Sequence, residues 1–135
     1  MAFDFGTRQI GLAVGQTLTA SGRPLAVLKA RDGQPNWQQI SDYIEQWQPD
    51  MLIVGLPLNM DGSESPFCKR ARKFARRLQG RMALPVKMVD ERLSTAEAKS
   101  RAEHPGNYRD NPVDSEAACL ILETWLQDPR LGILP

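Results

Sequence analysis

Hydrophobic positions follow a strand-like rhythm near the start of the chain and a helical rhythm further on. Ile10, Leu12 and Val14 alternate with small residues, as in a strand with one closely packed face. From Trp37 onward, hydrophobic residues recur every three or four positions, and Ile40 is the next of them. Three strands that precede alternating helices and strands predict an α/β fold, in which helices flank a mixed sheet.

The pattern predicts five strands and four helices in a single domain that spans residues 1–135. We expect strands at residues 1–5, 10–16, 25–30, 51–56 and 85–89. We expect helices at 37–47, 67–78, 94–103 and 113–127, turns at 6–9 and 21–24, and an irregular loop at 104–112. The first three strands are expected to be antiparallel, and the later strands to be parallel because helices connect them.

Composition narrows the class of protein. Hydrophobic residues make up 41% of the chain and charged residues 24%, which is typical of a soluble globular domain and excludes collagen-like and disordered chains. The longest apolar run, at 51–58, is much shorter than the roughly 20 residues that cross a bilayer, so we expect no membrane association. Cys68 and Cys119 lack metal-like spacing, and we expect no signal peptide. These features indicate a reduced, cytoplasmic protein.

The net charge is small, but the charges are unevenly distributed. Lys and Arg number 17 and Asp and Glu 16, which gives a net charge of +1. Residues 65–81 contain seven cations and no acid, so this segment carries +7 and the rest of the chain −6. A solvated helix face usually mixes both signs, whereas seven cations on one polar face favour contact with phosphate groups. The sequence therefore predicts a nucleic-acid partner.

Three acidic residues occupy positions that folding alone does not require. Asp4 interrupts an apolar strand, Glu91 follows one, and Asp114 lies on the apolar face of the last helix. Each also has an ordinary interpretation: a turn-forming residue at Asp4, a solvated strand end at Glu91, and an acid favoured by the helix dipole at Asp114. Together they predict an oxygen-rich cluster at the carboxyl ends of strands, where α/β sheets bind ligands.

We therefore expect Asp4, Glu91 and Asp114 to be both the catalytic residues and the metal ligands. Carboxylate oxygens suit Mg²⁺ or Mn²⁺, and the sequence offers no candidate zinc set of His and Cys and no Ser–His pair. Metal-assisted hydrolysis of a phosphodiester, in which bound ions activate a water and stabilise the leaving oxygen, is the chemistry that these residues favour.

The other candidates are polar side chains near the expected strand ends and cations of the basic helix. Asn59 lies in the loop at 57–65 and can donate to a substrate, although a plain loop residue is an equal alternative. The three tryptophans have core spacing and His104 lies in a polar loop, so we expect none of them to bind substrate. The residues that we expect to bind the substrate are Thr7, Arg8, Asn59, Lys69, Arg72, Lys73, Arg76, Arg77 and Arg92.

Four segments of the chain, taken in order, resemble the YqgF family, also called RuvX, of RNase H-like proteins. They are AFDFGTRQIGLAVG at 2–15, IVGLPLNMDGSESP at 53–66, DERLSTAEA at 90–98 and VDSEAA at 113–118. The resemblance covers nearly the whole chain and implies an RNase H-like fold with a five-stranded mixed sheet. The acidic positions of the family fall on Asp4, Glu91 and Asp114. One departure is Asn111-Pro112, where the family usually has a small residue followed by a basic one.

The resemblance implies a bacterial cytoplasmic nuclease that acts on structured nucleic acid. The family is described both as a Holliday junction resolvase and as a nuclease that matures the 5′ end of precursor 16S rRNA. We expect the RNA function, with a resolvase of branched DNA as the alternative. A resolvase needs two active sites and hence a dimer, and we expect a monomer or a weak homodimer.

Two other functions stay open. The segment 4–7 also resembles the first phosphate loop of actin-like and sugar-kinase ATPases, although those proteins close two domains around ATP. A non-catalytic RNA-binding module would account for the basic helix without the carboxylates, and it would tolerate Asp4→Asn without loss of function.

Overall fold

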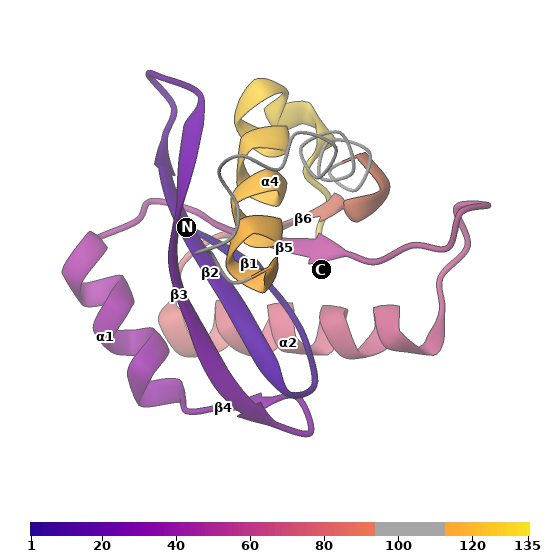
Figure 1. Ribbon diagram of the computed structural model, residues 1–135, viewed down its shortest axis with the longest axis horizontal. Coiled ribbons are helices and arrows are strands. Elements are labelled where there is room, and N and C mark those ends of the chain that lie inside the picture. Colours follow the sequence, from indigo (N-terminus) through magenta and orange to yellow (C-terminus); the bar gives the residue numbers. More distant parts are fainter. Residues whose placement is uncertain (94–112) are drawn as a thin grey trace.

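The computed structural model describes residues 1–93 and 113–135, and for residues 113–115 it covers the backbone only. The elements, in chain order, are β1 (Ala2–Asp4), β2 (Gln9–Gln16), β3 (Ser21–Arg31), β4 (Gln34–Pro35), α1 (Trp37–Trp47), β5 (Leu52–Leu56), α2 (Pro66–Met82), β6 (Val86–Asp90), α4 (Val113–Gln127) and the short 3-10 helix η2 (Pro129–Leu131) (Figure 1). The predicted helix at 94–103 and the loop at 104–112 lie outside the described residues.

The described strands form one mixed sheet in the order β4-β3-β2-β1-β5-β6. The pairs β1–β2, β2–β3 and β3–β4 are antiparallel, whereas β1–β5 and β5–β6 are parallel. The predicted mixed sheet is therefore confirmed, and β1 lies where its antiparallel and parallel halves meet. The sheet has one strand more than predicted, because Gln34 and Pro35 pair with Arg31 and Ala30.

Strand β3 begins at Ser21, earlier than the sequence predicts. Gly22 and Pro24 predict a turn at 21–24, and this prediction is wrong. Pro24 pairs with Ala13 where the register between β2 and β3 shifts, and proline is tolerated at such an irregularity because it supplies no N–H to the ladder. The turn lies at 17–20 instead.

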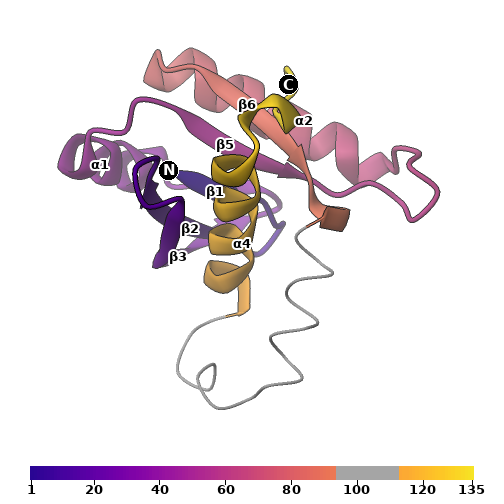
Figure 2. The same cartoon turned by 90° about the horizontal axis from the view of Figure 1, so that it is seen from above.

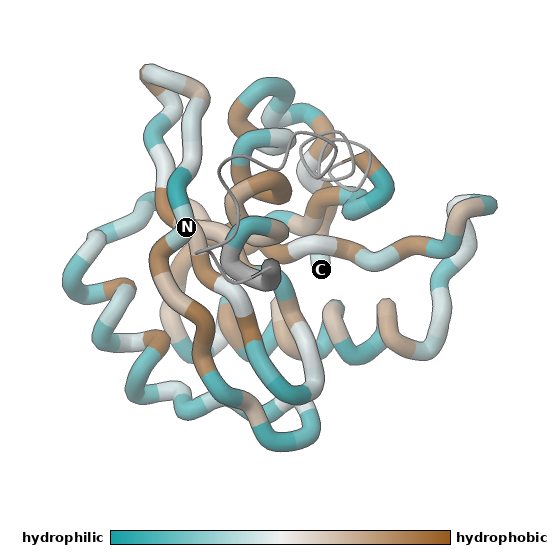
Figure 3. Tube along the Cα trace, viewed as in Figure 1, coloured by the Kyte–Doolittle hydropathy of each residue, from teal (hydrophilic) through white to brown (hydrophobic). Residues whose placement is uncertain are grey.

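Helices cover both faces of the sheet. Helices α1 and α2 pack on one face, in a core cluster that includes Phe3, Ile40 and Phe74. Helix α4 packs on the other face, in a cluster that includes Ile53 and Ile121. Figure 2 shows α4 on one side of the sheet and α2 on the other, and Figure 3 shows hydrophobic positions concentrated in the central strands. Residues on the two sides of the sheet are thus separated by its full thickness.

Helix α2 is amphipathic, as predicted. Pro66 occupies its first turn, where the missing N–H costs nothing, and Ala83 ends the helix in the left-handed conformation with φ 54°. The residues that it buries against the sheet are Cys68, Ala71, Phe74, Ala75 and Leu78. Because α2 connects the parallel strands β5 and β6, it begins at the carboxyl edge of the sheet and runs back toward the amino edge.

The cysteines and tryptophans have the structural roles that the sequence predicts. Cys68 and Cys119 are buried free thiols in separate core clusters on opposite faces of the sheet. The tryptophans pack against these clusters, with Trp37 and Trp47 on the α1 and α2 side and Trp125 on the α4 side. Within the described ranges, no helix has the length and apolar character needed to span a membrane.

Candidate active site

Asp4 is the last residue of β1, a strand that pairs on both sides. Successive side chains of a strand point to opposite faces, and Phe3 packs with α1 and α2 while Ala2 packs with α4. Asp4 therefore faces the α4 side of the sheet, where it is half-buried. This position at the carboxyl end of a central strand fits a functional site, as the sequence predicts.

Glu91 follows β6 directly and extends back over β5. The strand makes room for it with Gly55, since a β-carbon at that position would overlap Glu91 Oε1 and would lie 2.6 Å from Ile121 Cδ1. Glu91 thus occupies a narrow space between β5 and α4. In the sequence Gly55 is part of an apolar run, and the signal for this space is the glycine itself, because a glycine inside a strand often marks a close approach.

The side chains of Asp4 and Glu91 hydrogen bond to each other. Burial raises the pKa of Glu91 above its usual value, the bond to Asp4 opposes this rise, and the nearby charge of Asp90 adds to it. Two carboxyl groups in contact require a proton or a cation between them, because two bare negative charges repel each other. The structure thus brings together two of the three predicted carboxylates.

The third predicted carboxylate, Asp114, belongs to the first turn of α4. Its side chain lies outside the described part of the chain. Position 114 is two helical turns before Ile121, on the same face of α4, and Ile121 borders the space that holds Glu91. Among the side chains that the structure does describe, no group of three His, Cys, Asp or Glu residues is arranged to hold a metal ion.

Arg92, a predicted substrate contact, is engaged by neighbours within the protein. Its guanidinium donates to both oxygens of Asp90, with Nη2 2.7 Å from Oδ2, and Nη1 donates to the Met60 carbonyl at 3.2 Å. The hydrogen bonds from Arg92 to Asp90 lower the pKa of the Asp90 carboxyl below its usual value. Arg92 therefore ties the end of β6 to the loop at 57–65.

The loop at 57–65 projects from the carboxyl end of β5 (Figures 1 and 2). Asn59 Nδ2, the predicted substrate donor, donates to Ser63 Oγ at 3.0 Å, and the Asp61 carboxylate accepts from the Ser63 amide at 2.9 Å. The Gly62 amide closes the loop by donating to the Asn59 carbonyl at 2.9 Å. Internal hydrogen bonds thus hold the loop in shape, and one of them uses an N–H group of the Asn59 side chain.

Thr7 and Arg8, also predicted substrate contacts, form the turn that follows Asp4. The Thr7 carbonyl accepts from the Gly33 amide at 2.9 Å, and the Arg8 carbonyl accepts from the Ala30 amide at 2.8 Å. These bonds join the turn to β3 and to the turn before β4. Arg8 is exposed and lies four residues after Asp4 in the chain.

The cations of α2 are on the opposite face of the sheet from Asp4 and Glu91, because α2 and α4 cover different faces. Arg72 donates to both carboxylate oxygens of Glu64, at 2.8 and 3.1 Å, and it also donates to the Leu134 carbonyl. Glu64 lies one residue before the segment 65–81, which contains no acidic residue. Arg81 stacks on Trp37 at 4.6 Å. The predicted contacts on α2 that make no ion pair with a described residue are Lys69, Lys73, Arg76 and Arg77.

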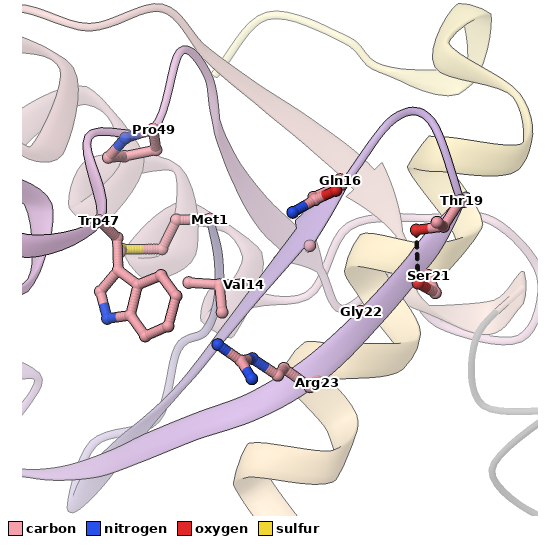
Figure 4. A pocket seen from close by; sticks show the side chains of 10 residues that line it. Met1, Val14, Gln16, Thr19, Ser21, Gly22, Arg23, Trp47 and Pro49 are labelled. Atoms are coloured by element: carbon pink, nitrogen blue, oxygen red, sulfur yellow. Dashed lines mark hydrogen bonds between the residues drawn. The ribbon is translucent and has the colours of Figure 1, made fainter.

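A cavity of about 460 Å³ lies at the other end of the sheet, near Met1 at the start of β1. Figure 4 shows its wall, in which the Arg23 guanidinium lies 4.9 Å from the Trp47 ring and Thr19 hydrogen bonds to Ser21. None of its ten lining residues carries a carboxylate, thiol or imidazole. This cavity therefore lacks the carboxylates that the sequence predicts for the site.

Comparison with known proteins gives one consistent family. Residues 1–128 match RuvX, described as Holliday junction resolvase. Three similar proteins are each named "Putative pre-16S rRNA nuclease". The Haemophilus ducreyi protein is 55% identical over 131 residues, which cover 95% of each chain. A Pseudomonas fluorescens protein is 54% identical over 138 residues, 99% of this chain and 94% of its own. The Chromohalobacter salexigens protein is 58% identical over 131 residues, 95% of this chain and 88% of its own.

Solved structures of RuvC from Thermus thermophilus are similar in fold. The structure of RuvC in complex with a Holliday junction substrate gives a TM-score of 0.58 at 14% identity, covering 97% of this chain and 96% of that chain. A second RuvC structure gives 0.55 at 14% identity, covering 96% of this chain and 95% of that chain. The likeness confirms the RNase H-like fold that the four sequence segments imply.

Proposed function

The chain belongs to the RuvX family, and from this premise we propose that it is a metal-dependent endonuclease that processes the 5′ end of precursor 16S rRNA. The observation that carries the proposal is the contact between Asp4 and Glu91 at the carboxyl ends of β1 and β6, the parallel strands on either side of β5. Hydrolysis of a phosphodiester requires groups that can manage negative charge and activate water, and paired carboxylates supply them through a bound cation. A reaction on precursor rRNA belongs in the cytoplasm.

The donor set fits a hard divalent cation such as Mg²⁺ or Mn²⁺. Asp4 and Glu91 present carboxylate oxygens to one another, and the burial that raises the pKa of Glu91 favours any partner that offsets its charge. Asp4 and Glu91 would hold the ion together with Asp114 from the first turn of α4. When bound, the ion stabilises charge on the phosphate and lowers the pKa of a water molecule.

The residues of the chain itself fix the geometry of the reaction. Strand pairing on both sides of β1 holds Asp4 in one orientation, and the space above Gly55 confines Glu91. A carboxyl group that is already held in place loses little conformational entropy when a ligand binds. The exposed side chain of Arg8, in the turn that follows Asp4, would position the phosphate backbone of the substrate.

The test is cleavage of precursor 16S rRNA by variants that keep the shape of each carboxylate but remove its charge. Asp4→Asn, Glu91→Gln and Asp114→Asn are each expected to lower the cleavage rate on the order of a thousandfold, since a metal contributes several kcal/mol to the transition state. Circular dichroism should show that the variants fold, and filter binding should show that they still bind RNA.

Asp42→Asn serves as the matched control, because Asp42 is exposed on α1, on the far side of the sheet from Glu91. It should cleave like the wild type. The proposal fails if the three carboxylate variants cleave normally, or if the wild type cleaves nothing in the presence of Mg²⁺ or Mn²⁺.

Resolution of a DNA junction is the second candidate function, supported by the description of the family and by the similarity in fold to RuvC. A resolvase cuts two strands symmetrically and needs two sites, whereas processing of an RNA end needs one. Cleavage of precursor 16S rRNA and of a four-way DNA junction should therefore be compared at equal protein concentration, with the oligomeric state measured by light scattering. A monomer that cuts the RNA faster than the junction supports RNA processing. A dimer that cuts only the junction overturns the proposal of RNA processing.

Two further measurements separate the remaining candidates. An ATPase of the actin-like or sugar-kinase type would bind and hydrolyse ATP. A non-catalytic RNA-binding module would retain its function in Asp4→Asn. ATP hydrolysis by the wild type would favour the first, and full function of Asp4→Asn would favour the second.

A further inference from the structure

A small cationic pocket lies on the face of the sheet opposite the carboxylates. It has a volume of about 110 Å³ and is lined by residues of α2, the start of α1 and the turn between β3 and β4. Its cations are Arg70, Lys73 and Arg77, which lie at i, i+3 and i+7 on one stripe of α2. Arg70 is not among the substrate contacts that the sequence predicts.

The charges of this pocket remain largely available. Asp32, the one carboxylate that lines it, accepts from Arg70 Nη2 at 2.8 Å through its side chain, and its carbonyl accepts from the same nitrogen at 2.8 Å. These two bonds hold the guanidinium in place at the mouth of the pocket. Lys73 and Arg77 make no ion pair with the part of the chain that the structure describes, so the lining keeps a net charge of about +2.

Aromatic rings close the inner side of the pocket. The Phe5 and Phe74 rings lie 5.2 Å apart, and the Trp37 ring stacks on Phe74 at 5.7 Å. Gly33, with φ +80°, keeps the opening clear, since a β-carbon there would lie 2.9 Å from Phe5 Cζ and 3.2 Å from Arg70 Nη2. A low-dielectric wall behind fixed cations strengthens their attraction for an anion.

The pocket and the carboxylate pair lie back to back at the end of β1. Asp4 faces the α4 side, and Phe5, the next residue, forms part of the pocket on the α2 side. At this edge of the sheet the turn at 6–8 and the turn at 32–33 form a rim, and the bond from the Gly33 amide to the Thr7 carbonyl joins these two turns. A nucleic-acid strand bound at Asp4 that passes over the rim arrives at the three cations.

We propose that this pocket is a second phosphate-binding site, which holds one backbone phosphate of the RNA substrate a few nucleotides away from the cleaved bond. The proposal rests on the proposed nuclease function. It gives the α2 face of the sheet one specific phosphate contact in place of a general electrostatic attraction for RNA. The small volume fits a phosphate group rather than a base, and the fixed guanidinium beside two free cations is a suitable partner for its oxygens.

The experiment measures binding, without cleavage, of substrate RNAs that each carry a single neutral methylphosphonate linkage at successive positions. Asp4→Asn protein is used so that the RNA stays intact. One linkage, outside the cleaved position, is expected to weaken binding on the order of tenfold, because it removes charge-assisted hydrogen bonds. The double variant Lys73→Gln/Arg77→Gln in the same protein should bind the all-phosphate RNA about tenfold more weakly and lose its sensitivity to that linkage.

The matched comparison is Lys69→Gln/Arg76→Gln, which removes the same charge from the same helix outside the pocket. It should keep its sensitivity to that single linkage. The pocket proposal is overturned if no linkage beyond the cleaved one matters, or if both double variants respond alike. Cleavage by the wild type is measured separately. If binding depends on this linkage but the wild type never cleaves the RNA, the nuclease function is contradicted and the pocket proposal is supported.

Discussion

Glu91 shows how a single buried carboxyl group links stability to function. Its side chain lies between Gly55 and Ile121, hydrogen bonds to Asp4 and lies near the charge of Asp90. Burial stabilises the neutral form, so the folded protein holds this proton more tightly than the unfolded chain does. At neutral pH the ionised group therefore destabilises the metal-free fold, and a cation would remove that penalty.

This balance predicts a pH-dependent effect of Glu91→Gln in the presence of EDTA. Because the pKa of Glu91 is raised, the free energy of unfolding of the wild type should fall as the pH rises past the usual carboxyl value. The variant lacks this titration, so it should be more stable than the wild type at pH 8 and lose its advantage near pH 4. Urea unfolding at several pH values measures the difference, and a wild type that is the more stable protein at pH 8 would contradict it.

Some contacts of the site could be predicted from the sequence, and others could not. Asp4 was predicted because it interrupts an apolar strand, and Glu91 because it follows a strand at the edge where α/β sheets bind ligands. The structure brings the two side chains together. The pairing of Arg92 with Asp90 and the Met60 carbonyl depends on a loop that returns to the end of β6, which no local pattern reports. The pairing of Arg72 with Glu64 has the same cause, since it depends on how the loop enters α2.

At the scale of elements, glycine in a strand acts as a spacer between layers. Strand β5 leaves an open position at Gly55, into which the residue after β6 and a residue of α4 both extend. The apolar run that predicts β5 gives no hint of this, because a buried strand and a strand that borders a site have similar hydropathy. The error at the start of β3 is similar, since Pro24 predicts a turn unless its place at the register shift is known.

Gly55→Ala tests the spacer role of β5. The new methyl group would overlap the Glu91 carboxylate and press on Ile121, so unfolding free energy should fall by about 1–3 kcal/mol. Cleavage should fall further than this loss of stability explains, because Glu91 has to move away from Asp4. Urea unfolding and cleavage of precursor RNA are measured on the same preparation.

The control is Gly80→Ala in α2, where a β-carbon meets no other atom within 4 Å. It should raise the unfolding free energy by about 0.5–1 kcal/mol, because alanine is the better helix former, and it should leave cleavage unchanged. If Gly55→Ala behaved like this control, β5 would not be the spacer that confines Glu91.

At the scale of the whole molecule, the sheet separates the two kinds of charge. The carboxylate pair lies on the α4 face and the cations of α2 on the other. Hydropathy predicts each element and its buried side, but it does not supply the strand order that decides which face a helix covers. The sequence therefore predicted the parts of the site and its fold, while their relative placement required the structure.

The salt dependence of RNA binding should distinguish free cations from paired ones. Arg76→Gln removes an exposed cation without an ion pair among the described residues, so it should reduce the slope of log K against log salt by up to about 1. Arg72→Gln removes a cation that Glu64 already neutralises, so the slope should change less and stability should fall instead. Equal changes in slope for the two variants would contradict the structural role of Arg72.

Metal-linked stability tests whether Asp4 and Glu91 form the metal site of a nuclease. Unfolding by urea is followed at pH 8 with increasing Mn²⁺ for the wild type, Asp4→Asn and Glu91→Gln. An ion that binds only the folded wild type should stabilise it by about 2.7 kcal/mol at a hundredfold excess over its Kd, and should stabilise the variants much less. An equal gain in all three proteins, or no gain in the wild type, would contradict the claim.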